Sequence, residues 1–145
     1  MICYLELPKI PYDILQIIPT ELNKYHCKIN YGTYNWSDSF NQELNAWGQQ
    51  YICKDMYFAF QLMTGDVPIH KDIGTQIKLI YLIETGGPNV LTKFWKDDQC
   101  TLLDSYKIKT HAWHILKADV FHSVDGVQPG QLRWSITGRV FSNNA

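Results

Sequence analysis

His70-Lys71-Asp72 opens the stretch of sequence that decides the fold, and Arg133 closes it. In an extended strand, residues i and i+2 point the same way, so the side chains of His70 and Asp72 can reach one ion. A second imidazole, His122, follows within another β-prone run. Two histidines and one carboxylate that leave coordination positions open are the donor set of non-haem Fe(II) oxygenases. The pattern therefore predicts one metal ion bound by His70, Asp72 and His122.

Arg133 begins a run in which polar and apolar residues alternate. Strand geometry places Arg133, Ser135 and Thr137 on one face. Trp134 and Ile136 fall on the other face, which we expect to pack outward against helices. A buried arginine needs an anionic partner, and its planar guanidinium fits a carboxylate. The sequence therefore predicts that Arg133 binds the carboxylate of a co-substrate, with Ser135 as a second donor.

A lone His-x-Asp tripeptide occurs by chance in many proteins, but the ordered set of residues is far more specific. It resembles the signature of the Fe(II)/2-oxoglutarate-dependent dioxygenases. The segments that carry the likeness to the prolyl-hydroxylase-like branch of this superfamily are His70-x-Asp72, Ile80-Tyr81-Leu82-Ile83-Glu84-Thr85-Gly86-Gly87, Thr92-Lys93-Phe94, His122 and Arg133-x-Ser135. The likeness runs from Tyr57 to Phe141, more than half of the chain.

The resemblance implies a double-stranded β-helix and an oxygenase with three partners: Fe(II), 2-oxoglutarate and O2. Such enzymes hydroxylate a C–H bond and release succinate and CO2. The resemblance assigns His70, Asp72 and His122 to the catalytic metal. For 2-oxoglutarate it adds Tyr81 to Arg133 and Ser135, with Thr92 as a further contact and Gln61 as a weaker one.

The composition limits the classes of protein to which the chain can belong. A chain of 145 residues, 46% hydrophobic and 14% aromatic, predicts one domain, 1–145, with a substantial core. The formal net charge is −1, and no basic run is present, so charge gives no argument for a nucleic-acid or membrane partner. We therefore expect a small molecule or a protein side chain as the substrate, and the sequence leaves the oligomeric state open.

The cysteines indicate a reducing compartment. Cys3, Cys27, Cys53 and Cys100 are widely spaced, without a Cys-x-x-Cys pair. The N-terminus lacks the basic and apolar regions of a secretory signal, and no apolar run reaches the length of a spanning helix. Reduced thiols in the cytoplasm are the resulting expectation.

The N-terminal part, 1–55, is predicted to be a helical support. Ile10–Ile18 is expected to be a short helix that ends at Pro19. A turn is expected at 20–24, followed by an irregular connection at 30–37. A second helix is expected to begin near Ser37 or Asp38. Its apolar face is formed by residues at three- and four-residue steps, namely Phe40, Leu44, Trp47 and Tyr51.

From residue 56 to 142 the pattern changes to short strands bounded by turns. The expected strands are Tyr57–Met63, Ile77–Ile83, Val90–Trp95, Thr101–Leu103, Lys109–Leu116, Val120–Val124 and Leu132–Phe141. Many short strands at this spacing are typical of a sandwich or jelly roll. The predicted class is therefore mainly β, a double-stranded β-helix with the N-terminal helices on its outer face.

Three other readings stay open. A cupin-like metal-binding protein without 2-oxoglutarate chemistry would leave Arg133 unexplained. A nucleic-acid demethylase of the same superfamily would need a basic surface, which the sequence does not show. An inactive binding module would not need the three metal ligands. His111 and His114 are expected to be ordinary packing residues, and Arg139 is expected to be structural.

Overall fold

The computed structural model describes residues 1–17, 36–97 and 101–140. Most of its regular structure is β-strand, arranged in two antiparallel sheets. The elements are β1 (Ile2–Leu5), α1 (Tyr12–Leu15), β2 (Trp36–Phe40), α3 (Gln42–Tyr51), β3 (Tyr57–Met63), β4 (Val67–His70), β5 (Ile77–Thr85), β6 (Leu91–Trp95), β7 (Leu102–Tyr106), β8 (Trp113–Lys117), β9 (His122–Asp125) and β10 (Arg133–Arg139).

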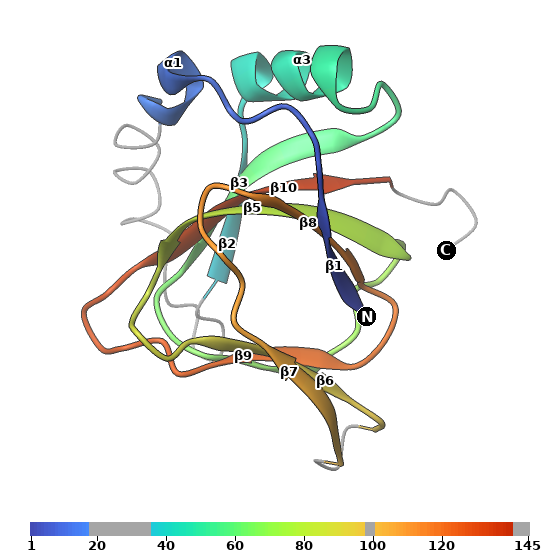
Figure 1. Cartoon of the computed structure of the whole chain (residues 1–145), viewed down its shortest axis with the longest axis vertical. Coiled ribbons are helices and arrows are strands. Elements are labelled where there is room, and N and C mark those ends of the chain that lie inside the picture. Colours follow the sequence, from blue (N-terminus) through green and yellow to red (C-terminus); the bar gives the residue numbers. More distant parts are fainter. Residues whose placement is uncertain (18–35, 98–100, 141–145) are drawn as a thin grey trace.

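The two sheets face each other as the layers of a jelly roll (Figure 1). The larger sheet has six strands in the order β1-β8-β5-β10-β3-β2, and the smaller has four in the order β4-β9-β6-β7. Strands far apart in the sequence are thus neighbours, because β10 lies between β5 and β3. This arrangement confirms the predicted mainly-β, double-stranded β-helix.

The helices α1 and α3 cover the outer face of the larger sheet (Figure 1). The core between them contains Leu44 of α3, Phe58 of β3 and Ile136 of β10, all at most 1% exposed. Trp134 packs against this core. The prediction that the apolar residues of β10 face outward onto helices is therefore confirmed.

The predicted start of the second helix is wrong. Ser37 and Asp38 lie in β2, which pairs with β3 at the edge of the larger sheet. The helix begins at Gln42, where the side chain of Asn41 accepts a hydrogen bond of 2.9 Å from the amide of Leu44. Pairing with a neighbouring strand thus overrides the local capping signal.

Other N-terminal expectations need similar corrections. The first helix is shorter than expected, from Tyr12 to Leu15 after an extended Pro11, and Ile2–Leu5 is a strand that the sequence did not indicate. Cys3 and Cys53 carry no disulfide. The predicted turn at 20–24, the connection over 30–35, and Cys27 and Cys100 lie outside the described residues.

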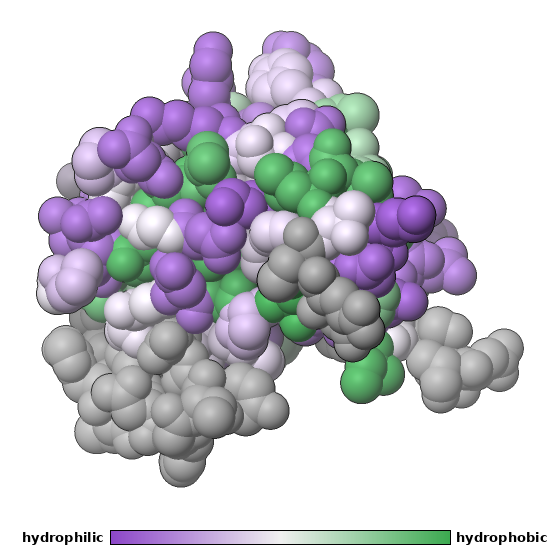
Figure 2. Space-filling view, turned by 90° about the horizontal axis from the view of Figure 1, so that it is seen from below, coloured by the Kyte–Doolittle hydropathy of each residue, from purple (hydrophilic) through white to green (hydrophobic). Residues whose placement is uncertain are grey.

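The surface opposite the helices is mixed in character. Figure 2 shows hydrophobic residues set among hydrophilic ones on the face seen from below. Neither helix in the described part of the chain has the length and hydrophobicity that a membrane span needs.

Two glycines enclose the ring of Phe58, and this contact gives a stability prediction. A Cβ added to Gly138 of β10 would lie 2.7 Å from Phe58 Cε1, and one added to Gly48 of α3 would lie 2.3 Å from Phe58 Cδ2. Overpacking of this kind costs about 1–3 kcal/mol. Gly138→Ala is therefore expected to lower the urea midpoint of unfolding without changing the slope.

A double variant provides the control. Phe58→Leu removes ring atoms from the contact, so adding it to Gly138→Ala should destabilise by less than the sum of the two single changes. Additive losses would show that the clash with Phe58 is not the cause.

Candidate metal centre

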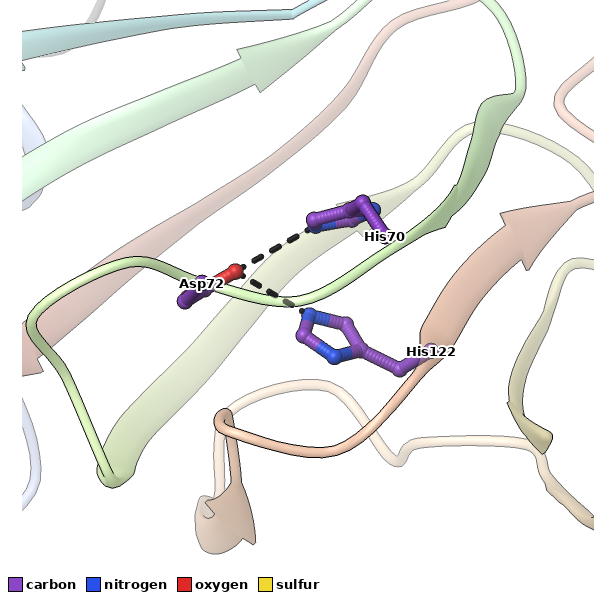
Figure 3. A group of neighbouring side chains, drawn as sticks. All are labelled: His70, Asp72 and His122. Carbon is purple, nitrogen blue, oxygen red and sulfur yellow. Dashed lines mark ion pairs between the residues drawn. The ribbon is translucent and has the colours of Figure 1, made fainter. Parts of the chain in front are cut away.

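The three predicted ligands converge at one edge of the smaller sheet. His70 is the last residue of β4 and His122 is the first of β9, and the two are direct cross-strand partners. Asp72 lies just beyond the end of β4, where its amide donates a hydrogen bond of 2.9 Å to the carbonyl of Ala118. The strand does not continue through Asp72 as the i, i+2 pattern assumed, because β4 ends at His70. The loop nevertheless directs its carboxylate toward both imidazoles (Figure 3).

The distances within the cluster suit a small cation. Asp72 Oδ1 lies 3.3 Å from His70 Nε2 and 3.2 Å from His122 Nε2. The ligand atoms of the three residues all lie within 4.8 Å of one another. Among the residues that the structure describes, no other group of three such side chains meets this test.

Backbone contacts orient both imidazoles in the same way. The Nδ1 atom of His70 lies 2.7 Å from the carbonyl of Pro68, and the Nδ1 atom of His122 lies 2.7 Å from the carbonyl of Val120. A carbonyl only accepts, so each Nδ1 carries the proton and donates it. In a neutral imidazole, Nε2 then has a free lone pair. Two lone pairs and one carboxylate oxygen point at a common centre, which is the arrangement that a divalent cation requires.

Polar atoms without hydrogen-bond partners also indicate that this centre can hold a cation. His122 Nε2 and Asp72 Oδ2 are buried and have no hydrogen-bond partner among the described residues. Burial by itself would raise the pKa of Asp72, but contacts with His122 and His70, together with the charge of Lys78, hold it well below its ordinary value. Asp72 is therefore an anion at neutral pH and is available as a ligand.

Lys78 is a buried neighbour of the cluster. Its Nζ lies 3.5 Å from Asp72 Oδ2, and its side chain is 8% exposed. Burial lowers the pKa of Lys78. Lys78 is not among the site residues that the sequence predicted. The signal that could have found it is a single lysine that precedes the apolar run 79–83 within the strand Ile77–Thr85.

A cavity of about 380 Å³ extends from the His-Asp-His cluster to Arg133. Residues of both sheets line it, including His70, Asp72, His122, Arg133, Lys78, Ile80, Thr92, Leu116, Val124 and Arg139. The predicted residues Arg133 and Thr92 therefore share a cavity with the predicted ligands. Ser135 is buried on the same face of β10 but is not part of the cavity wall.

Arg133 is held firmly in this cavity. It is 3% exposed, and its Nη1 donates a hydrogen bond of 3.0 Å to the carbonyl of Thr85. Burial lowers its pKa to about 10, so the guanidinium stays charged at neutral pH. Gly86 has a φ of +82°, and a Cβ there would lie 2.8 Å from Arg133 Cβ. The Gly-Gly segment after β5 thus provides the room that this arginine needs.

Tyr81, like Ser135, is a predicted site residue that is not part of the cavity wall. It pairs with Ile136 of β10 and Trp113 of β8, and its ring centroid lies 5.2 Å from that of Trp113. It is buried in the core beneath the helices, on the opposite face of β5 from Lys78 and Ile80. The predicted contact between Tyr81 and 2-oxoglutarate is therefore wrong, because the side chain points out of the barrel.

Two further expectations concern residues outside the cluster. His111 is exposed and precedes β8, whereas His114 lies within β8, and neither joins the metal group. Arg139 is expected from the sequence to have only a structural role, but it lines the cavity. The alternation that places Arg133 inside the barrel extends along β10 to Arg139, so the signal was available in the sequence.

Comparison with known proteins supports the fold alone. No protein-family model matches the chain, and no curated protein matches it. Among solved structures, it resembles EvdMO1, with a TM-score of 0.57 and 14% identity over 99% of this chain and 47% of that one. It also resembles Peruvianin-I, a cysteine peptidase from Thevetia peruviana latex, with a TM-score of 0.51 and 11% identity over 80% of this chain and 68% of that one.

A weaker likeness is to a RmlC-like cupin protein from Desulfovibrio desulfuricans, with a TM-score of 0.42 and 10% identity over 77% of this chain and 88% of that one. The chain spans about half the length of the EvdMO1 chain. The class defined by fold and site is thus a jelly-roll protein with a His-Asp-His group able to hold a metal ion.

Proposed function

We propose that the protein is an Fe(II)- and 2-oxoglutarate-dependent oxygenase that hydroxylates a C–H bond. One observation carries the proposal: a His-Asp-His cluster and a buried, charged arginine line the same cavity. The cluster fits a metal, and a buried arginine without a carboxylate partner is costly. A dicarboxylate that contacts the metal at one end and Arg133 at the other satisfies both requirements.

The chain's own residues have distinct roles in this proposal. His70, Asp72 and His122 hold the metal, and the carbonyls of Pro68 and Val120 keep the imidazoles in the correct tautomer. Bound iron would supply the redox chemistry of dioxygen and the 2-oxo acid, which side chains cannot perform. The reaction takes one oxygen atom of O2 into the product hydroxyl and the other into succinate, with loss of CO2.

Arg133 binds the distal carboxylate of 2-oxoglutarate and thereby fixes the orientation of the oxo acid. Thr92 is buried and lines the same cavity, so its hydroxyl is placed to donate a second hydrogen bond. The apolar side chains of Ile80, Leu116 and Val124 form other parts of the wall and exclude water from the metal. Exclusion of water strengthens the electrostatic contacts of the bound carboxylate.

The test is the conversion of 2-oxoglutarate to succinate by the protein with Fe(II) and O2. Even without a primary substrate we expect slow succinate release, which should rise when a substrate is added. Zn(II) in place of Fe(II) should stop the release while leaving 2-oxoglutarate bound. His122→Ala is the inactive control. A metal-loaded protein that does not bind 2-oxoglutarate would favour the alternative of a cupin-like metal-binding protein.

A further inference from the structure

The cavity has a second cationic region at the opposite end of β10 from Arg133. Arg139 is the last residue of β10, and its direct cross-strand partner on β5 is Lys78. Both residues line the cavity, together with Trp36 and Gln61. Lys78 contacts the metal ligand Asp72 at 3.5 Å, so this end of the cavity borders the metal centre.

Part of the hydrogen-bonding capacity of this region is not used within the described part of the chain. Arg139 Nε is buried and has no hydrogen-bond partner there, and the same is true of Gln61 Oε1. Arg139 forms an ion pair with Asp38, whose Oδ2 lies 3.8 Å from Arg139 Nη1, beyond hydrogen-bond length. Asp38 Oδ1 accepts a hydrogen bond of 3.0 Å from Gln61 Nε2 instead. A buried donor on Arg139 and a buried acceptor on Gln61 are therefore available to bind a ligand.

The charges of the cavity point to an anion. Apart from the exposed Lys71, the cations that line the cavity are the buried Lys78 and Arg133 and the partly buried Arg139, whose side chain is 17% exposed. The nearby carboxylates are Asp72, which pairs with Lys78, and Asp38, which pairs with Arg139 and whose side chain is 34% exposed. An added Fe(II) and a 2-oxoglutarate dianion cancel each other. One net positive charge then remains in this group, and Arg139 keeps a free donor at Nε because its ion pair with Asp38 is made through Nη1.

The size of the cavity limits what the anion can be. Ligand pockets range from about 300 to 1,000 Å³, and this one measures about 380 Å³. It must hold 2-oxoglutarate as well, so the space left beside the metal suits a compact molecule. A singly charged group that one guanidinium binds through two parallel hydrogen bonds is a carboxylate.

We propose that Arg139 and Gln61 form the binding subsite for the primary substrate, and that this substrate is a small carboxylic acid. Arg139 binds its carboxylate, and Gln61 Oε1 accepts a hydrogen bond from a hydroxyl or N–H group of the same molecule. The inference rests on the proposed function, because it assigns the space that iron and 2-oxoglutarate leave.

Acetate serves as the probe, and neutral acetamide of similar shape is its control. Both are titrated anaerobically into protein loaded with Mn(II) and 2-oxoglutarate, and the relaxation of their methyl protons by Mn(II) is measured by NMR. We expect acetate to relax several-fold more than acetamide, and Arg139→Gln to bring acetate to the acetamide level. Lys117→Gln removes the same charge from an exposed position on β8 and should have no effect.

Equal relaxation of acetate and acetamide in the parent protein, or an unchanged acetate effect in Arg139→Gln, would overturn the subsite. A loss of 2-oxoglutarate affinity in Arg139→Gln as large as that in Arg133→Gln would also overturn it, since Arg139 would then serve the co-substrate. Failure of the proposed function is separate: the parent would bind Mn(II) but not 2-oxoglutarate. In that case the acetate titration of the Mn(II)-loaded protein still decides the role of Arg139.

Discussion

Replacing Asp72 with alanine is expected to abolish stoichiometric binding of Fe(II). The carboxylate is the only anionic ligand of the cluster, and its Oδ1 lies between the two imidazole nitrogens at 3.2 and 3.3 Å. Loss of an outer partner of a metal ligand already costs roughly 10- to 100-fold in affinity, and loss of the ligand itself should cost more. Metal content after dialysis and anaerobic titration measure the effect, and Mn(II), Co(II) or Zn(II) should behave in parallel.

A loss of iron binding identifies Asp72 as a ligand only if the variant keeps its fold, so the fold needs a control. Asp72→Ala also leaves Lys78 without its acidic partner, and circular dichroism should be recorded beside the titration. Asp119→Ala removes an equal charge from an exposed position and should bind iron as the parent does. Undiminished tight Fe(II) binding in a folded Asp72→Ala protein would refute the assignment of the ligand.

Arg133→Leu is expected to weaken the binding of 2-oxoglutarate by about 2–5 kcal/mol, the usual effect of truncating one partner of a buried charge pair. At about 1.4 kcal/mol for each tenfold change, this is a loss of at least tenfold. Iron binding should persist, because Arg133 is not among the ligand group. Calorimetric titration of 2-oxoglutarate into anaerobic, metal-loaded protein measures the change.

The pH dependence of the parent gives an independent check on this arginine. Because the pKa of Arg133 is about 10, its charge persists across neutral pH, and affinity for 2-oxoglutarate should not fall there through loss of that charge. If Arg133→Leu binds 2-oxoglutarate as tightly as the parent, the anchor is elsewhere, and Lys78 or Arg139 becomes the candidate.

The sequence predicted the strands of the barrel well because their periodicity is local. Tyr57–Met63 is a strand with the predicted bounds, and the other predicted strands differ mainly at their ends. The strand β2 was missed because its sequence, Trp36-Ser37-Asp38-Ser39-Phe40, has no apolar run and is extended through its pairing with β3. Such a strand depends on its neighbour, which a local pattern does not contain.

The predictions for the candidate site were likewise right for some residues and wrong for others. The order of His70, Asp72, His122 and Arg133 in the sequence was sufficient to predict that these residues line one site. The error at Tyr81 arose because β5 is apolar on both faces, so alternation could not tell which face points inward. A shift of one residue exchanges the two faces of a strand. Lys78, on the inner face, marked the correct register.

The division of the cavity between two sheets has a consequence for how such a protein can diverge. The metal ligands belong to β4, β9 and the loop after β4, whereas both cavity arginines belong to β10 on the other layer. On the proposed function, substitutions in β10 would therefore alter which acid binds without disturbing the geometry of the His-Asp-His group. Under the proposed function, related proteins could therefore keep the His-Asp-His group while Arg139 and its neighbours change, and so acquire new substrates by few substitutions.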